Sequence, residues 1–154
     1  VLDQVPVAVW IVEAPSGRLL VDNPHARRFM QQPRSPVQSP KDYVGYRSFH
    51  QDGSPYTAED YPLTGALKGE SVEKRFMRIE HLNGRSGFAH ISAAPVKNAM
   101  GEIIAAVAVG VDVTNEIETQ EKLRESEARF RSIANALPMI VWTADPDFKI
   151  DWYN

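Results

Sequence analysis

The sequence contains no cysteine, so disulfide bonds, thiolate catalysis and cysteine-ligated zinc are all excluded. It also lacks any apolar run close to the roughly 20 residues that span a bilayer, so we expect no direct membrane contact. Basic residues are not in excess, since 17 Lys and Arg face 20 Asp and Glu. Nucleic-acid binders usually carry a basic surface, so we expect no nucleic-acid partner.

Motifs of catalysis are missing as well. Neither a P-loop nor G-x-G-x-x-G occurs, no His–Glu pair has zinc spacing, and no serine stands in a nucleophile elbow. A small acid/base isomerase would need a buried carboxylate on a sheet, for which Asp112 is the only candidate. Its position beside Thr114 fits the start of a helix better. We therefore expect no catalytic residue, no metal site and no enzyme activity in this chain.

What is present is an ordinary globular composition. The 154 residues are 43% hydrophobic and 24% charged, which predicts a folded domain of usual size. The chain starts at Val1 rather than at Met and stops at Asn154 within an aromatic run. We therefore expect it to be a piece of a longer protein.

The first part of the chain predicts a hairpin and short helices. Apolar runs at 5–12 and 18–21 flank Pro15-Ser-Gly17, which predicts two strands around a tight turn. Asn23 before Pro24 has the pattern of an N-cap followed by a first-turn proline, so a short helix to about Met30 is expected.

A proline-rich loop is expected at 32–40, and 43–55 looks irregular. Thr57 and Asp60 have capping-box spacing, which predicts a helix over 57–68.

Three longer strands are predicted over 72–81, 88–96 and 103–113. The short connections between them contain Gly84 and Gly101, which is typical of an antiparallel meander. On the third strand one face carries only small residues, which leaves room for a helix, large side chains or a ligand. The other face carries Val107, Val109 and Val111, and something must cover them.

A long polar helix is predicted over 115–136. Its apolar residues recur at steps close to a heptad, which favours a parallel dimeric coiled coil over a solvated connector. The seam residues are Ile117, Leu123, Phe130 and Ile133. We expect a homodimer through this helix, helped by the valine face.

The two ends of the chain are similar to each other. Residues 6–10 match 138–142, and a shift of one residue then places Asn23 on Asn154. The sequence therefore predicts a tandem array with a truncated second copy. The expected parts are a first domain at 1–114, a linker or coiled-coil signalling helix at 115–136, and the start of a second domain at 137–154.

In this order the elements resemble a PAS domain over about residues 3–114. Several segments are similar to a bacterial subfamily found mostly in sensor histidine kinases: Phe49-His-Gln-Asp-Gly-Ser-Pro-Tyr56, Asp60-Tyr-Pro-Leu63, Ala93-Ala-Pro-Val96, Asp112-Val-Thr114 and Ser126-Glu-Ala-Arg-Phe130.

The resemblance implies an α+β fold: a five-stranded antiparallel sheet, helices on one face, and a long C-terminal signalling helix. It implies a cytoplasmic sensory module of a two-component system, with flanking PAS and output domains in the parent chain. The alternatives are a ligand-free dimerisation or interaction module, or a PAS domain of a diguanylate cyclase.

By analogy with ligand-binding PAS domains, a small-molecule pocket would lie between the concave sheet face and the helices. An ordinary packed core, in which Trp10 fills the space beside the alanines, is the alternative. The candidate pocket residues are Trp10, Val12, Phe49, Tyr56, Leu63, Leu67, Ile91, Ala106 and Ala108. Asp112 and Thr114 are the candidate switch between the sheet and the long helix.

No cofactor is predicted. A haem-binding PAS domain would place a histidine on the helix before the meander, and 57–68 contains none. His50 is the only plausible axial ligand, and loop packing or solvent exposure is the better interpretation of it. A photoactive flavin of the light-sensing type needs a cysteine for its adduct, so that cofactor is not expected either.

Overall fold

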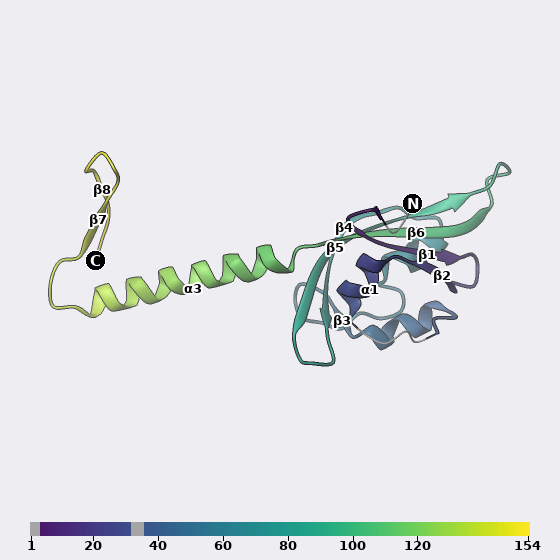
Figure 1. Ribbon diagram of the computed structural model, residues 1–154, viewed down its shortest axis with the longest axis horizontal. Coiled ribbons are helices and arrows are strands. Elements are labelled where there is room, and N and C mark those ends of the chain that lie inside the picture. Colours follow the sequence, from purple (N-terminus) through teal and green to yellow (C-terminus); the bar gives the residue numbers. More distant parts are fainter. Residues whose placement is uncertain (1–3, 32–35) are drawn as a thin grey trace. The chain divides into compact units, whose positions relative to one another are not determined.

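The computed structural model describes residues 4–31 and 36–154 and divides into two compact units, one ending at Thr114 and one running from Asn115 to Asn154 (Figure 1). The start of the proline-rich loop, residues 32–35, lies outside the described residues. Each unit is described by itself.

The first unit is built on one antiparallel sheet with the strand order β2-β1-β6-β5-β4-β3. The three long strands form the expected meander, and β1 pairs with β6, so the two ends of the unit lie side by side in the sheet. The strands are β1 (Ala8–Glu13), β2 (Leu19–Asp22), β3 (Ser48–Phe49), β4 (Val72–Glu80), β5 (Ser86–Lys97) and β6 (Ile103–Asp112).

The α+β fold is as expected, with one strand more than the five predicted. Ser48 pairs with Ile79 and Phe49 with Arg78, which adds β3 to the edge of the sheet. A two-residue strand is too short to produce an alternating pattern, so nothing in the sequence of 43–55 distinguishes it from a loop.

The helical layer differs more from expectation. It consists of α1 (Pro24–Met30), the 3-10 helix η2 (Pro40–Tyr46) and α2 (Pro62–Leu67). The prediction of a helix from Thr57 is wrong. The Asp60 carboxylate accepts from the Thr57 amide and from the Thr57 hydroxyl, both at 2.7 Å, so only one of the two bonds of a capping box forms, and these bonds close a turn. Tyr61 is extended because the following residue is Pro62, so α2 can begin only there.

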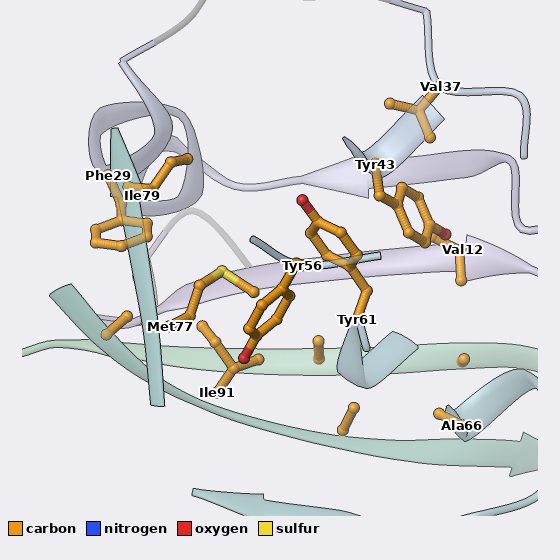
Figure 2. Close-up of a cluster of buried hydrophobic side chains, with 14 residues drawn as sticks. Val12, Phe29, Val37, Tyr43, Tyr56, Tyr61, Ala66, Met77, Ile79 and Ile91 are labelled. Atoms are coloured by element: carbon orange, nitrogen blue, oxygen red, sulfur yellow. The ribbon is translucent and has the colours of Figure 1, made fainter. Parts of the chain in front are cut away.

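The two faces of the sheet have different surroundings. The inner face carries Val12, Ile91, Ala106 and Ala108, which pack with Phe29 of α1 and Ala66 of α2 in one buried cluster (Figure 2). The outer face of β6 carries Val107, Val109 and Val111, which are half-buried to exposed.

The second unit consists of α3 (Thr114–Ala136, whose first residue belongs to the first unit) and the hairpin β7 (Trp142–Ala144) and β8 (Ile150–Tyr153). The helix confirms the predicted 115–136 within one residue. No helix among residues 4–31 and 36–154 is long and apolar enough to cross a membrane.

The hairpin of the second unit repeats the register of the first. Trp142 pairs with Tyr153 in the second hairpin, as Trp10 pairs with Asp22 in the first. The pairing register shifts between Ile11 and Val12 in the first hairpin and at the equivalent place, between Thr143 and Ala144, in the second.

An asparagine side chain then closes each hairpin in the same way. Asn23 Oδ1 accepts from the Val9 amide at 3.1 Å, and its Nδ2 donates to the Val7 carbonyl at 2.8 Å. Asn154 makes the equivalent bonds to Val141 and Met139, at 2.9 and 3.0 Å.

Candidate functional site

A small cavity lies inside the first unit, between the inner face of the sheet and the helical layer. It has a volume of about 70 Å³, and its described lining carries no charged side chain. Four of the candidate pocket residues line it: Trp10, Leu63, Ile91 and Ala108. Ligand sites usually measure about 300–1,000 Å³, so the cavity has room for a few water molecules or a very small ligand only.

The other candidate pocket residues do not line the cavity. Val12, Tyr56 and Ala106 are buried in the surrounding core, and Leu67 packs against it. Phe49 instead carries the Arg78 guanidinium 4.2 Å above its ring, which is a cation–π contact near the edge of the sheet.

Sequence analysis missed most of the aromatic lining. Tyr43 and Tyr46 come from η2 and Tyr61 from the residue before α2, segments in which no helical or strand periodicity singles out a buried residue. The burial of Met77 could have been inferred, because it alternates with Ile79 along β4. The remaining lining residues that were not predicted are Leu19, Met30, Val37 and Pro62.

Three tyrosines stand together beside the cavity: the Tyr61 ring centroid lies 5.4 Å from that of Tyr43 and 5.2 Å from that of Tyr56 (Figure 2). Tyr43 donates to the Gly17 carbonyl at 2.9 Å and Tyr56 to the Phe76 carbonyl at 2.6 Å. Burial raises the pKa of Tyr56 to about 12 and raises the pKa of Tyr43 further. Their hydroxyls are therefore neutral donors engaged with backbone.

Tyr61 differs from its two neighbours. Its hydroxyl has no partner with hydrogen-bond geometry within the described chain, and the same holds for the Ser48 hydroxyl. Burial raises the pKa of Tyr61, while the nearby Ser48 hydroxyl and backbone act against this rise. The two hydroxyls are thus neighbours that do not satisfy each other, which leaves Tyr61 as a cavity-lining residue with a buried, unpartnered hydroxyl that can orient a small ligand.

Trp10 occupies much of the space that the small residues leave. A methyl group on Gly110 would lie 2.9 Å from the Trp10 ring and 2.8 Å from Ile91. The Trp10 indole therefore packs against the small-residue face of β6 at Gly110, which favours the packed-core interpretation for that part of the sheet.

The end of β6 is joined to β5 through Thr114. Asp112 Oδ1 accepts from the Thr114 amide at 2.9 Å and from its hydroxyl at 2.5 Å. The Thr114 oxygen in turn accepts from the Phe88 amide at 2.9 Å. We call Phe88, Asp112 and Thr114 the sheet–helix joint, because Thr114 is the first residue of α3.

The predicted interface residues lie mostly at the surface. Val109, Val111, Leu123 and Ile133 are exposed, and Ile117 and Val107 are half-buried. Phe130 contacts Trp152 of its own unit, with ring centroids 5.5 Å apart, so at least this seam residue has a partner within the chain.

The one histidine that could have served a haem lies away from the cavity. The His50 ring is 4.2 Å from that of Tyr56, and its Nε2 lies 3.5 Å from Asp60. No group of three or more metal-ligating side chains occurs in the described part of the chain.

Comparison with solved structures identifies the fold of the first unit. An RNA-binding light-oxygen-voltage (LOV) receptor aligns over 82% of this chain at 19% identity, with a TM-score of 0.56. The LOV domain of a blue-light activated histidine kinase from Erythrobacter litoralis aligns over 72% of this chain and 99% of its own, at 16% identity and a TM-score of 0.53. The PAS domain of Bordetella pertussis BvgS aligns over 82% of this chain and 91% of its own, at 13% identity and a TM-score of 0.50.

The fold is therefore that of PAS and LOV domains. This chain spans only 35% of the RNA-binding receptor. Comparisons of the sequence with protein-family models and with curated proteins give no match.

Proposed function

We propose that this chain is a sensory, signal-relaying module of a bacterial multidomain protein, and that the parent protein is a sensor histidine kinase. The fold and the likeness to a histidine kinase LOV domain support this proposal. The observation that carries it is the sheet–helix joint, where one hydroxyl links β5, the end of β6 and the first residue of α3. A change in the relative position of β5 and β6 is thereby transmitted to α3.

The joint is suited to switching because it is weak. Losing a capping-type hydrogen bond costs about 1 kcal/mol, which is small against a total stability of about 5–15 kcal/mol. It is comparable with the few kcal/mol that separate two signalling states. A mutation here changes output before it changes folding.

The test uses a chimera in which residues 1–136 are joined to the catalytic core of a histidine kinase. Asp112→Ala and Thr114→Ala are expected to change basal autophosphorylation by about fivefold or more, with thermal melting shifted by only about 4–8 °C. Thr119→Ala, an exposed threonine within α3, is the matched control. Unchanged output in both joint variants, with folding intact, would reduce Asp112 and Thr114 to residues that only stabilise the start of a helix.

The proposal includes a tandem arrangement, with a first domain at 1–114, a signalling helix at 115–136 and a second domain that begins at 137. The shared hairpin register and the equivalent asparagine hydrogen bonds support it. A signal passing through α3 would then enter the second domain at the hairpin β7–β8.

Dimerisation through α3 is part of the same proposal. Exposed Leu123 and Ile133, together with Val109 and Val111 on the sheet, supply apolar surface for a second copy. A parallel dimer would place two signalling helices next to each other, as a dimeric output domain requires.

A second candidate function is an interaction module that binds no ligand and relays changes from a neighbouring domain. The cavity of about 70 Å³ favours it. Native mass spectrometry of the purified protein, compared with its denatured mass, distinguishes the two, since a co-purified small molecule appears only in the native spectrum.

A further inference from the structure

A second and larger cleft lies on the first unit, outside the core. It is bounded by α1, by residues 6–8 at the start of β1 and by the end of β6, and its volume is about 320 Å³. This is within the range of sites for small molecules, unlike the core cavity. Its lining is mixed: Pro6, Val7, Ala8 and Phe29 are apolar, Gln31 is polar, and three groups can carry charge, namely His25, Arg28 and Asp112.

The two bases of the cleft come from one face of α1. His25 and Arg28 are three residues apart, so they are neighbours on the helix. Neither side chain forms an ion pair or hydrogen bond with the described residues. Arg27 beside them behaves differently, because it is paired with Asp22 at 2.9 Å. The helix therefore directs one arginine to a structural partner and leaves the next one free above the cleft.

Asp112 gives the cleft a group of opposite charge. Its Oδ1 is engaged with Thr114, and no ion pair joins it to either base in the described structure. A ligand with several negative charges would be repelled by this carboxylate. A ligand that carries one carboxylate and one ammonium group matches both sides, since a guanidinium pairs with a carboxylate through two parallel N–H bonds.

We propose that the α1 cleft binds a small zwitterion, namely a free α-amino acid with an apolar side chain. Its carboxylate accepts hydrogen bonds from Arg28 and His25, its ammonium group donates to Asp112, and its side chain lies against the apolar lining residues Pro6, Val7 and Ala8. Because Asp112 belongs to the sheet–helix joint, an ammonium group at this carboxylate competes with Thr114. This signalling consequence rests on the proposed function, whereas binding itself does not.

The test is a two-dimensional amide NMR titration of the 154-residue protein with L-leucine. Saturable shifts are expected in residues 25–31 and 110–114, with a dissociation constant on the order of 1 mM or below. The probes 4-methylpentanoate and 3-methylbutylamine lack one charged group each, and both are expected to bind at least about tenfold more weakly. Arg28→Ala should abolish the shifts, and Arg27→Ala, the matched control on the same helix, should leave the dissociation constant unchanged.

Three results would overturn the proposal: no saturable shift, shifts that persist in Arg28→Ala, or equal binding of leucine and 4-methylpentanoate. Shifts confined to the core residues Tyr61, Leu63 and Met77 would also overturn it, since they would place the probe in the other cavity. None of these results bears on the kinase chimera, so a failure here is distinguishable from a failure of the proposed function.

Discussion

Single polar groups connect segments of this protein that are distant in sequence. Asn23 is fully buried and joins β1 to α1, Thr114 joins β5 to β6, and Asp60 closes the turn before α2. Each of them satisfies backbone amides that would otherwise be unpaired, which costs about 1–3 kcal/mol for a buried group. Their effects are therefore local, and each can be tested by one substitution.

The turn at Thr57 gives a pH-dependent prediction. Hydrogen bonds from the Thr57 hydroxyl and amide hold the pKa of Asp60 below its usual value of 3.8. Because the folded-state pKa is lowered, the stabilisation is fully present above the usual pKa and is lost as the pH falls through the lowered one. Thr57→Ala is expected to raise the pKa of Asp60 towards its usual value, measured by NMR titration of the carboxyl carbon.

A crossed control is available in the neighbouring loop. Ser54 donates to Asp52 and lowers the pKa of that carboxyl in the same way. Ser54→Ala should therefore raise the pKa of Asp52 and leave Asp60 unchanged. If Thr57→Ala did not move the pKa of Asp60, the hydrogen bonds of this turn would not persist in solution.

The close packing of Trp10 against Gly110 gives a second prediction at the residue scale. Gly110→Ala adds a methyl group within 3 Å of both Trp10 and Ile91, and such overpacking costs about 1–3 kcal/mol. The melting temperature should fall by about 4 °C or more. Gly45→Ala is the control, since nothing lies within 4 Å of the added methyl group there. Equal melting of the two variants would mean that the indole has room to move aside.

At the scale of elements, the contrast is between the sheet and α3. The long strands β4, β5 and β6 bury residues within the first unit, whereas α3 has a single buried residue, Ala134. A helix of this composition is not stabilised by burial within its own unit. The proposed relay of signals through α3 then depends on what covers its apolar residues.

Association through α3 is tested by Leu123→Glu. The leucine is 60% exposed in the single chain and lies in the proposed seam, so a charge there should weaken dimerisation by about tenfold or more. Leu82→Glu is the matched control, because Leu82 is 74% exposed in a turn. Sedimentation velocity measures both. A monomer at high concentration for the unmutated protein would contradict the seam.

At the scale of the whole molecule, both units contain a hairpin closed by the side chain of an asparagine. Asn23 and Asn154 make equivalent hydrogen bonds within their hairpins. Asn23 is also fully buried in the first unit, and its side chain caps α1 by accepting from the Ala26 amide. The asparagine side chain should therefore contribute much more to the free energy of unfolding in the first unit than in the second.

Asn23→Ala is expected to lower the free energy of unfolding of the first unit by about 2–4 kcal/mol, because three backbone groups lose their partner. Asn154→Ala should leave that value unchanged within about 0.5 kcal/mol. Hydrogen exchange resolves the units, since Val9 should lose protection in the first variant and Val141 only in the second. Loss of Val9 protection in Asn154→Ala would show that the units are not independent.

Where local pattern decides, sequence and structure agree. Alternation along β5 and β6, Pro24 after Asn23, and the match of both hairpins at offsets of 132 and 131 residues were readable directly. The period of a strand or helix is a property of neighbouring residues, so one sequence is enough to find it.

The sequence by itself determined every strand of the first unit except β3, together with the short helix α1, the long helix α3 and which face of β6 is inner. Only the tertiary structure decided that Tyr43 and Tyr61 line the cavity, that Thr114 pairs with Phe88, and that Arg28 stands over the same cleft as Asp112. The physical reason is that Tyr43 and Tyr61 lie in segments without a regular helical or strand period, and that the other contacts join residues of different strands and helices. Their partners are brought to them by strand pairing and helix packing across many residues, which no local pattern encodes.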